Sequence, residues 1–235
     1  MRRQYPAVFP FSDAIFGWYD LGATFFWALS GAMLAARRGY DVMGIFIIAF
    51  VSSTGGGMLR DGLFLPGSAS PKVIQTPNYL IIVVVVTAVV VVFGRALRRL
   101  GWLPRVLTLA DALGIGAYGA VGMHLAVAAG IPMMGAILIG VINAVGGGAL
   151  RDLLMGEKLE LLQPSVLMGL ASVMGCILFA VLLTLGVPGP WAGAAAALTA
   201  FVIRLLALRF NLRSRALSAF EEDWRHDADR GKSPP

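Results

Sequence analysis

The sequence predicts an all-helical membrane protein, built from two inverted three-helix repeats and one extra helix. Three observations support this fold class: an apolar composition, seven apolar stretches of membrane-spanning length, and a duplication within the chain. Of the 235 residues, 58% are hydrophobic and only 14% are charged, and the mean hydropathy is +0.79. Soluble domains are roughly 45–50% apolar and about a quarter charged. The composition therefore indicates an integral membrane protein.

Seven stretches are long and apolar enough to cross a bilayer, which takes about 20 residues of helix. One of them, "YLIIVVVVTAVVVVF", is rich in β-branched residues, as a buried strand would be, but its length and its neighbours favour a helix in lipid. The expected spans are residues 13–36, 40–65, 77–97, 105–129, 131–156, 163–186 and 190–208.

A repeat relates the two halves of the chain. When the sequence is shifted by 91 positions, "GGGMLRDGL" at 55–63 falls on "GGGALRDLL" at 146–154 without a gap. Asp20 falls on Asp111 in the same register. Each copy contains three spans, an odd number, so the second copy must insert upside down relative to the first. Inverted repeats of this kind are a recurrent plan of transporters and channels, with the site at the repeat interface.

The distribution of Lys and Arg predicts the orientation. Most of these residues fall on one side of the expected spans, and only Arg2, Arg3 and Lys72 fall on the other. Because cytoplasmic loops carry the excess of positive charge, we expect an outside N-terminus and a cytoplasmic C-terminus, in a bacterial inner membrane. The expected organisation is an extracytoplasmic segment (1–12), the first repeat (13–97), a cytoplasmic loop (98–104), the second repeat (105–186), a seventh helix (190–208) and a basic, polar cytoplasmic tail (209–235).

The two glycine triplets lie near the middle of the second and fifth spans. Gly weakens a helix by roughly 1 kcal/mol relative to Ala, so three together predict a kink or a break. Carbonyl groups freed there must be satisfied by protein, water or an ion, and nearby hydroxyl and amide oxygens suit a partly dehydrated cation. The alternative is close packing, since small residues let membrane helices approach. The residues expected along an ion pathway are Ser52, Ser53, Thr54, Gly55, Gly56, Gly57, Arg60, Asn143, Gly146, Gly147, Gly148 and Arg151.

Charged residues inside the spans are the second unusual feature, because such a charge needs a partner and is a functional hypothesis by default. Asp20 precedes Arg60 by forty residues. In the second repeat, Asp111 precedes Arg151 by the same interval. We therefore expect one Arg–carboxylate pair within each repeat, on opposite sides of the membrane midplane, and a purely structural role is the alternative. The expected charge partners are Asp20, Asp61, Asp111 and Asp152.

Several classes of function lack any supporting motif. Cys176 is the single cysteine, so no intrachain disulfide can form. The two histidines offer no metal site, and we expect His124 to be a packing residue. The chain has no phosphate-binding glycine loop, no dinucleotide fingerprint and no nucleophile–base arrangement. We expect no enzymatic activity, no cofactor, no bound metal and no nucleic-acid partner.

The duplicated GGGxLRD motif, the arrangement of three, three and one spans, and the Asp that opens each repeat resemble the prokaryotic branch of the trimeric intracellular cation (TRIC) channel family. Some bacterial members of that family are also described as carrying a glycine transporter domain. The resemblance covers residues 13–186 and extends to the seventh span. The lysine–glutamate–valine signature of the eukaryotic branch is absent from the second span, so lipid regulation and calcium-store coupling are not expected.

The resemblance implies a seven-helix protomer in membrane lipid, a homotrimer, and one pore within each protomer. The kinked second and fifth helices would line that pore, which would pass K⁺ with some Na⁺. Carried over to this chain, the kinks would lie at Gly55–Gly57 and Gly146–Gly148, with Arg60 and Arg151 on the pore side.

Two functions remain open at this point. A passive monovalent-cation channel must neutralise two arginines near its path, and an ion-pair gate would do so, opening when Arg60 or Arg151 moves aside. A secondary transporter for a small amino acid such as glycine would instead use an Arg and helix amides to hold a carboxylate. A structural membrane protein without flux would leave the repeated polar groups unexplained.

Overall fold

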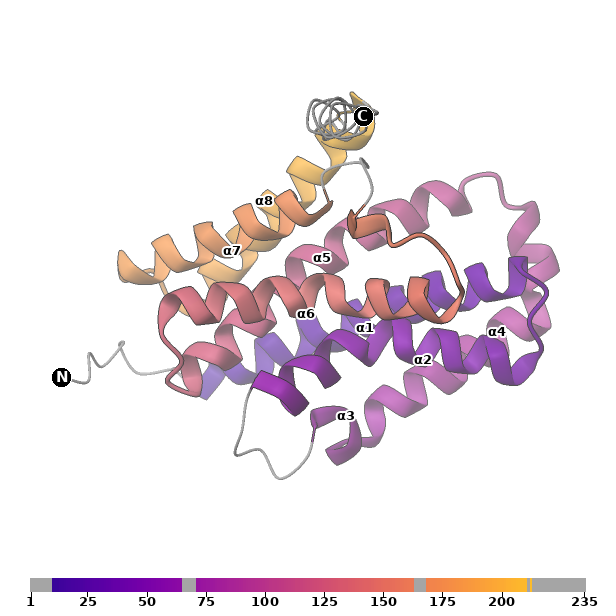
Figure 1. The fold of residues 1–235 in the computed structure, drawn as a ribbon, viewed down its shortest axis with the longest axis horizontal. Helices are drawn as coiled ribbons and strands as arrows, with labels where there is room; N and C mark the ends of the chain where they lie inside the picture. The colour runs from indigo at the N-terminus through magenta and orange to yellow at the C-terminus, as the bar shows by residue number, and fades with distance from the viewer. Residues whose placement is uncertain (1–9, 65–70, 163–167, 211, 213–235) are drawn as a thin grey trace, which may run out of the picture.

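The computed structural model describes residues 10–64, 71–162, 168–210 and 212, and all regular structure in these ranges is helical (Figure 1). Between the long helices lie a π-helical turn, η1 (Arg60–Phe64), and two short helices, α3 (Lys72–Gln75) and η2 (Glu160–Leu162). The long helices are α1 (Pro10–Arg37), α2 (Val42–Leu59), α4 (Pro77–Arg99), α5 (Leu103–Ala128), α6 (Met133–Leu154), α7 (Met168–Thr184) and α8 (Gly189–Arg209).

Each long helix coincides with one of the seven expected spans. In the described part of the chain, five helices are long and apolar enough to cross a membrane by length and composition, namely α2 with η1, α4, α5, α6 and α8, and α7 is a shorter apolar helix. The valine-rich stretch is helix α4, and its exposed Ile81, Val84 and Val92 suit a lipid-facing side. The expected segment 1–12 and tail 209–235 lie mostly outside the described residues.

Local sequence explains where several helices begin and end. Asp41 caps α2, because its side chain accepts a hydrogen bond from the backbone N–H of Gly44 at 2.8 Å. Gly39 and Gly130 end α1 and α5 with φ values of 77° and 78°, which favour glycine. In both turns the amide after the glycine donates to the carbonyl five residues back, Tyr40 to Ala35 (3.2 Å) and Ile131 to Ala126 (3.0 Å). The two turns match in the 91-residue register, so the repeat extends to local geometry.

Each repeat has a hydrophobic core of its own. Met33, Ile48 and Val86 are buried together where α1, α2 and α4 pack in the first repeat. Met123 and Phe179 belong to the corresponding core of the second repeat, which α8 also joins. The extra helix α8 packs on α5 and α7, so it extends the second repeat.

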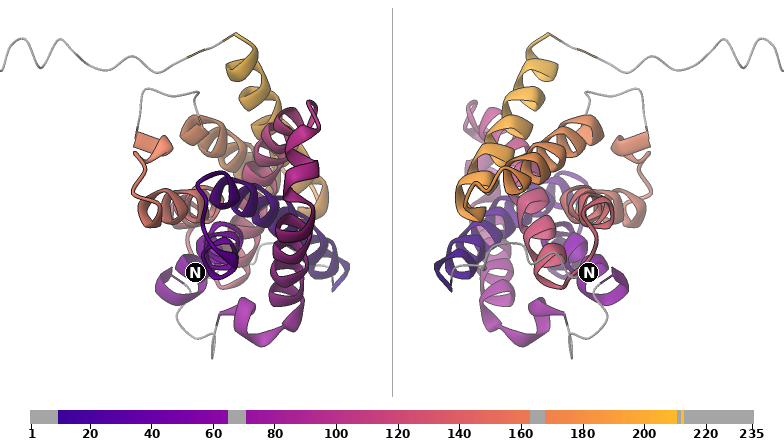
Figure 2. Two further views of the ribbon diagram at one scale, coloured as in Figure 1. Left: turned by 90° about the vertical axis from the view of Figure 1, so that its right-hand side faces the viewer. Right: turned by 90° about the vertical axis from the view of Figure 1, so that its left-hand side faces the viewer.

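The two repeats meet along α1 with α5 and along α2 with α6. Figures 1 and 2 show α2 and α6 side by side, and in Figure 1 they run in opposite directions on the side of the bundle nearest the viewer. Trp27 of α1 and Tyr118 of α5, which are equivalent in the repeat register, pack edge to face with ring centroids 6.0 Å apart. Equivalent residues meet at this junction because the two repeats are related by an approximate two-fold axis.

Candidate functional site

The glycine triplets form the crossing point of α2 and α6. A Cβ atom built on Gly56 would overlap the backbone carbonyl oxygen of Asn143, and one built on Gly147 would overlap that of Ser52. Backbone atoms cannot turn aside as a flexible side chain can. The helices therefore touch backbone to backbone, a contact that requires glycine at both positions.

The neighbouring glycines show the symmetry of this crossing. A Cβ on Gly55 would lie 2.9 Å from the side chain of Leu150, and a Cβ on Gly146 would lie 2.9 Å from that of Leu59. These two contacts are the same one in the repeat register, made in opposite directions. The two helices are therefore antiparallel and related by the approximate two-fold axis, as the inverted repeat predicts.

Of the kink or break expected at the triplets, the structure contradicts the break, and the kink stays a prediction. Helix α2 continues through its triplet to Leu59, and α6 continues through the second triplet to Leu154. Close packing, the alternative interpretation, is what the glycines provide: contacts with the opposing helix offset the low helix propensity of glycine. The irregular backbone of the first repeat lies beyond the triplet, in the π-helical turn η1 that begins at Arg60.

Two of the expected pathway hydroxyls are committed to their own helix. Ser53 donates to the carbonyl of Ala49 at 2.8 Å, and Thr54 donates to that of Phe50 at 2.7 Å. Such bonds let hydroxyl groups sit within an apolar helix. Ser53 links the two repeats through its backbone instead, because its carbonyl accepts a hydrogen bond from the Tyr118 hydroxyl at 2.5 Å.

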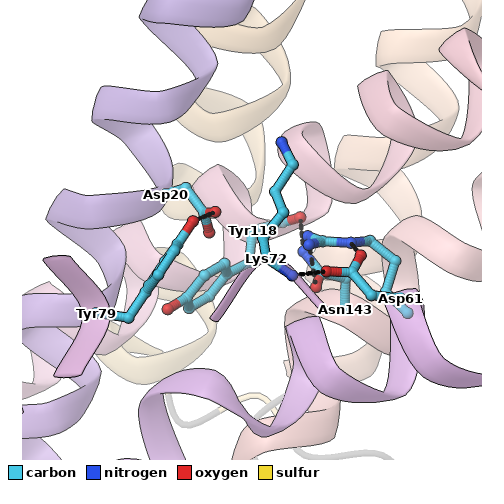
Figure 3. A network of polar contacts seen from close by, with 7 residues as sticks. Asp20, Asp61, Lys72, Tyr79, Tyr118 and Asn143 are labelled. Carbon is cyan, nitrogen blue, oxygen red and sulfur yellow. Dashed lines mark hydrogen bonds and ion pairs between the residues drawn. The ribbon is translucent and has the colours of Figure 1, made fainter. Parts of the chain in front are cut away.

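A buried polar cluster surrounds Arg60 on one side of the crossing (Figure 3). The Arg60 side chain is 2% exposed; its Nε donates to Asp61 at 2.6 Å and its Nη1 donates to the side-chain oxygen of Asn143 at 3.2 Å. The Asn143 amide donates in turn to the backbone carbonyl of Tyr118 at 2.6 Å. The second Asp61 oxygen accepts the backbone N–H of Lys72 at 3.0 Å. The cluster thus joins both repeats.

The expected ion pair between Asp20 and Arg60 is not formed among the described residues. Asp20 is buried and accepts a hydrogen bond from the Tyr79 hydroxyl at 2.5 Å (Figure 3). Arg60 pairs instead with the adjacent Asp61, another of the expected charge partners. Tyr79 and Tyr118 were not among the expected site residues. A tyrosine within an apolar span was the available signal, since its hydroxyl needs a partner there.

The second polar cluster surrounds Arg151 on the other side of the crossing. Arg151 donates to Asp152 from Nε at 2.9 Å and from Nη2 at 2.7 Å. The expected Asp111–Arg151 pair is also not formed in the described part of the chain, because Asp111 pairs with Arg204 of α8 at 3.9 Å. Arg204 was not predicted, although a charged residue in the seventh span was a signal for it.

A cavity of about 330 Å³ opens beside this second cluster. The Arg151 side chain is 10% exposed and borders it, whereas Arg60, its equivalent in the first repeat, is enclosed. The two sides of the crossing therefore differ, and we call the Arg60 side sealed, because that side chain is enclosed, and the Arg151 side hollow, because of this cavity. The polar residues that line the cavity are Ser30, Arg37, Thr108, Asp111, Arg151 and Arg204.

The remaining candidates belong to the packing of the bundle. His124 stacks on Phe16 with ring centroids 4.0 Å apart. Cys176 is buried against the glycines of α5 and α6. Within the described ranges, no group of three or more His, Cys, Asp or Glu residues is placed to hold a metal ion.

Comparison with known proteins identifies the repeated unit. The family model described as Glycine transporter matches residues 17–95 and again residues 108–184. The two matches start 91 residues apart, which is the offset of the repeat in the sequence. Together they cover well over half of the chain.

Curated relatives are membrane proteins. The UPF0126 membrane protein of Vibrio cholerae is 31% identical over 193 residues, which are 82% of this chain and 79% of the relative. The UPF0126 inner membrane protein YadS of Escherichia coli is 29% identical over 197 residues, which are 83% and 93% of the two chains.

Solved structures share the fold. The TRIC trimeric intracellular cation channel orthologue from Rhodobacter sphaeroides superposes with a TM-score of 0.77 at 27% identity, over 85% of this chain and 100% of the other. A TRIC cation channel studied for its conductance superposes with a TM-score of 0.76 at 26% identity, over 85% and 96%. The chain is an integral membrane protein with the TRIC channel fold, and it belongs to the family described as Glycine transporter.

Proposed function

We propose that this protein is a passive channel for monovalent cations, with one pathway in each protomer of a homotrimer. The observation that carries the proposal is the position of the polar residues, which lie on both sides of the α2–α6 crossing inside an otherwise apolar bundle. Similarity to a trimeric cation channel orthologue supports both the cation and the trimer. A preference for K⁺ over Na⁺ follows the family resemblance.

The arrangement of charges removes the main physical objection to a cation pathway. Arg60 and Arg151 would repel a cation, but each is paired with the aspartate that follows it, so each pair carries no net charge. Asp20, held by Tyr79, adds a carboxyl group on the Arg60 side. We propose that a cation passes when the sealed Arg60 cluster loosens, and that Asp20 and Asn143 are then among the groups that face it.

The proposed orientation places the Arg60 cluster towards the outside and the Arg151 cavity towards the cytoplasm. It rests on the Lys and Arg distribution of the sequence, because cytoplasmic loops carry the positive excess. The N-terminal segment would then be extracytoplasmic, the loop at 98–104 and the tail from 209 cytoplasmic, and the two repeats would insert with opposite orientations. A reporter fused to the C-terminus should be active only in a cytoplasmic assay.

A second function, transport of a small zwitterion such as glycine, is favoured by one observation. The 330 Å³ cavity presents guanidinium groups of Arg151 and Arg204 together with the carboxylate of Asp111. Such a pairing would complement the carboxylate and the ammonium of an amino acid. The description of the family agrees with this alternative.

Purified protein in liposomes separates the two functions. A channel gives K⁺ flux down a gradient in the absence of glycine, and the flux rises in proportion to the gradient. Saturable glycine uptake without K⁺ conductance would refute the channel and support the transporter. Native mass spectrometry of the same preparation should give a trimer, and a monodisperse monomer in mild detergent would contradict the assembly.

A further inference from the structure

Positions 52 and 143 occupy equivalent sites in the two repeats but carry different side chains. A Cβ on Gly31 would lie 2.7 Å from the Cβ of Ser52, and a Cβ on Gly122 would lie 2.8 Å from the Cβ of Asn143. Both side chains are buried, with 1% and 2% of their surface exposed. The two positions therefore pack against equivalent glycines and are similarly buried, and they differ in the side chain that they carry.

Asn143 fastens the sealed side of the crossing. Its amide group accepts a hydrogen bond from Arg60 and donates one to the backbone carbonyl of Tyr118, so it links the first repeat to α5 and α6 of the second. A hydrogen bond to a charged group is worth more than one between neutral groups. Asn143 therefore holds the Arg60 guanidinium in place beside Asp61.

Ser52 makes no such link on the hollow side. Within the residues that the structure describes, its buried hydroxyl has no hydrogen-bond partner. In the repeat register, Arg151 corresponds to Arg60, and the carbonyl of Trp27 corresponds to that of Tyr118. A serine carries one atom beyond Cβ where asparagine carries three, so it cannot bridge these two groups. Arg151 is left to border the cavity.

We infer that the difference between Ser52 and Asn143 determines which end of the pathway is closed. Asparagine at 143 fastens Arg60 to the opposite repeat. Arg151 bonds to Asp152 of its own repeat, and serine at 52 gives it no bond to the opposite repeat among the described residues. The inference deepens the proposed function by naming a closing device for the same pathway. Which arginine is held by the opposite repeat does not depend on whether the pathway conducts ions.

Reactivity of two cysteine reporters tests the inference in purified, detergent-solubilised protein. Gly57→Cys places a thiol against Arg60, because a Cβ there would meet only the Arg60 guanidinium, at 3.6 Å. Thr108→Cys places a thiol in the cavity beside Arg151. The chain that retains only the buried Cys176 gives the background rate of reaction with a water-soluble maleimide.

Exchanging the two side chains should exchange the two rates. Asn143→Ser should raise the reaction rate of the Gly57→Cys reporter about tenfold, because losing one hydrogen bond to a charged group shifts the equilibrium between held and released Arg60 by about that factor. Ser52→Asn should lower the rate of the Thr108→Cys reporter by a similar factor. Ser52→Ala, the matched control, should change neither rate, since the serine hydroxyl bonds to nothing in the described part of the chain.

An unchanged Gly57→Cys rate in folded, trimeric Asn143→Ser protein would overturn the inference. If that variant does not fold, Ser52→Asn decides alone, and an unchanged Thr108→Cys rate in it would overturn the inference equally. Asn143→Asp retains an acceptor for Arg60 and should keep the Gly57→Cys reporter protected. Absence of K⁺ flux from the wild-type protein would refute the proposed channel but not this inference, so the two failures can be told apart.

Discussion

Replacing Gly56 by Ala tests the backbone contact at the helix crossing. The added Cβ would overlap the carbonyl oxygen of Asn143, so α2 and α6 must move apart. Overpacking a core costs up to about 3 kcal/mol, and the better helix propensity of Ala recovers about 1 kcal/mol. The net loss of unfolding free energy is therefore expected to be about 2 kcal/mol.

Gly57→Ala is the matched control, one residue further along the same triplet. Its Cβ would meet only the Arg60 guanidinium, at an ordinary contact distance of 3.6 Å, so this change should raise stability by up to about 1 kcal/mol through helix propensity. Denaturant unfolding of both variants in one detergent measures the difference. Equal stability would refute the packing role and favour a hinge, because stiffening a hinge affects both positions alike.

Two further changes probe the polar cluster on the sealed side. Arg60→Ala leaves the buried Asp61 carboxylate without its ion-pair partner and should lower the free energy of unfolding by about 3–5 kcal/mol. Arg95→Ala, at an exposed position, should change it by no more than about 0.5 kcal/mol. Similar melting temperatures for the two variants would contradict the burial of the Arg60–Asp61 pair. Tyr79→Phe removes the hydrogen-bond donor to Asp20 and should lower the unfolding free energy by about 1.5–3 kcal/mol. A melting temperature equal to that of the parent protein would contradict this role of Tyr79.

The helices and the repeat could be predicted because both depend on local sequence. A span needs only enough consecutive apolar residues, and in lipid even the valine-rich stretch 77–97 must satisfy its backbone bonds within the helix, so it forms α4 despite its β-branched residues. The 91-residue register likewise needs no knowledge of contacts, and the family match reproduces it.

The ion-pair partners could not be predicted from spacing. Asp20 and Arg60 are separated by forty residues in both copies because duplication preserves every interval, whether or not the two residues touch. The partners that form are adjacent, Arg60 with Asp61 and Arg151 with Asp152. Adjacent residues do not face each other on a regular helix, so sequence spacing carried no signal for them.

The role of the glycine triplets depended on a partner that the sequence does not place. A run of glycines weakens an isolated helix, and the same run permits close approach once a second helix lies against it. In the structure the two triplets meet each other at the approximate two-fold axis, so the glycines serve close packing of the two helices. A duplicated motif in inverted repeats has this meeting as a natural outcome, because the axis brings equivalent surfaces together.

The contact between α2 and α6 has the geometry of an isologous interface, the kind that joins two identical subunits, here contained within one chain. In a dimer of separate three-helix units, any substitution at the interface would occur on both sides at once. Joining the units in one polypeptide removes that restriction, so each half can change alone. The equivalent positions 52 and 143 carry serine and asparagine, and only the joined chain can carry such a difference.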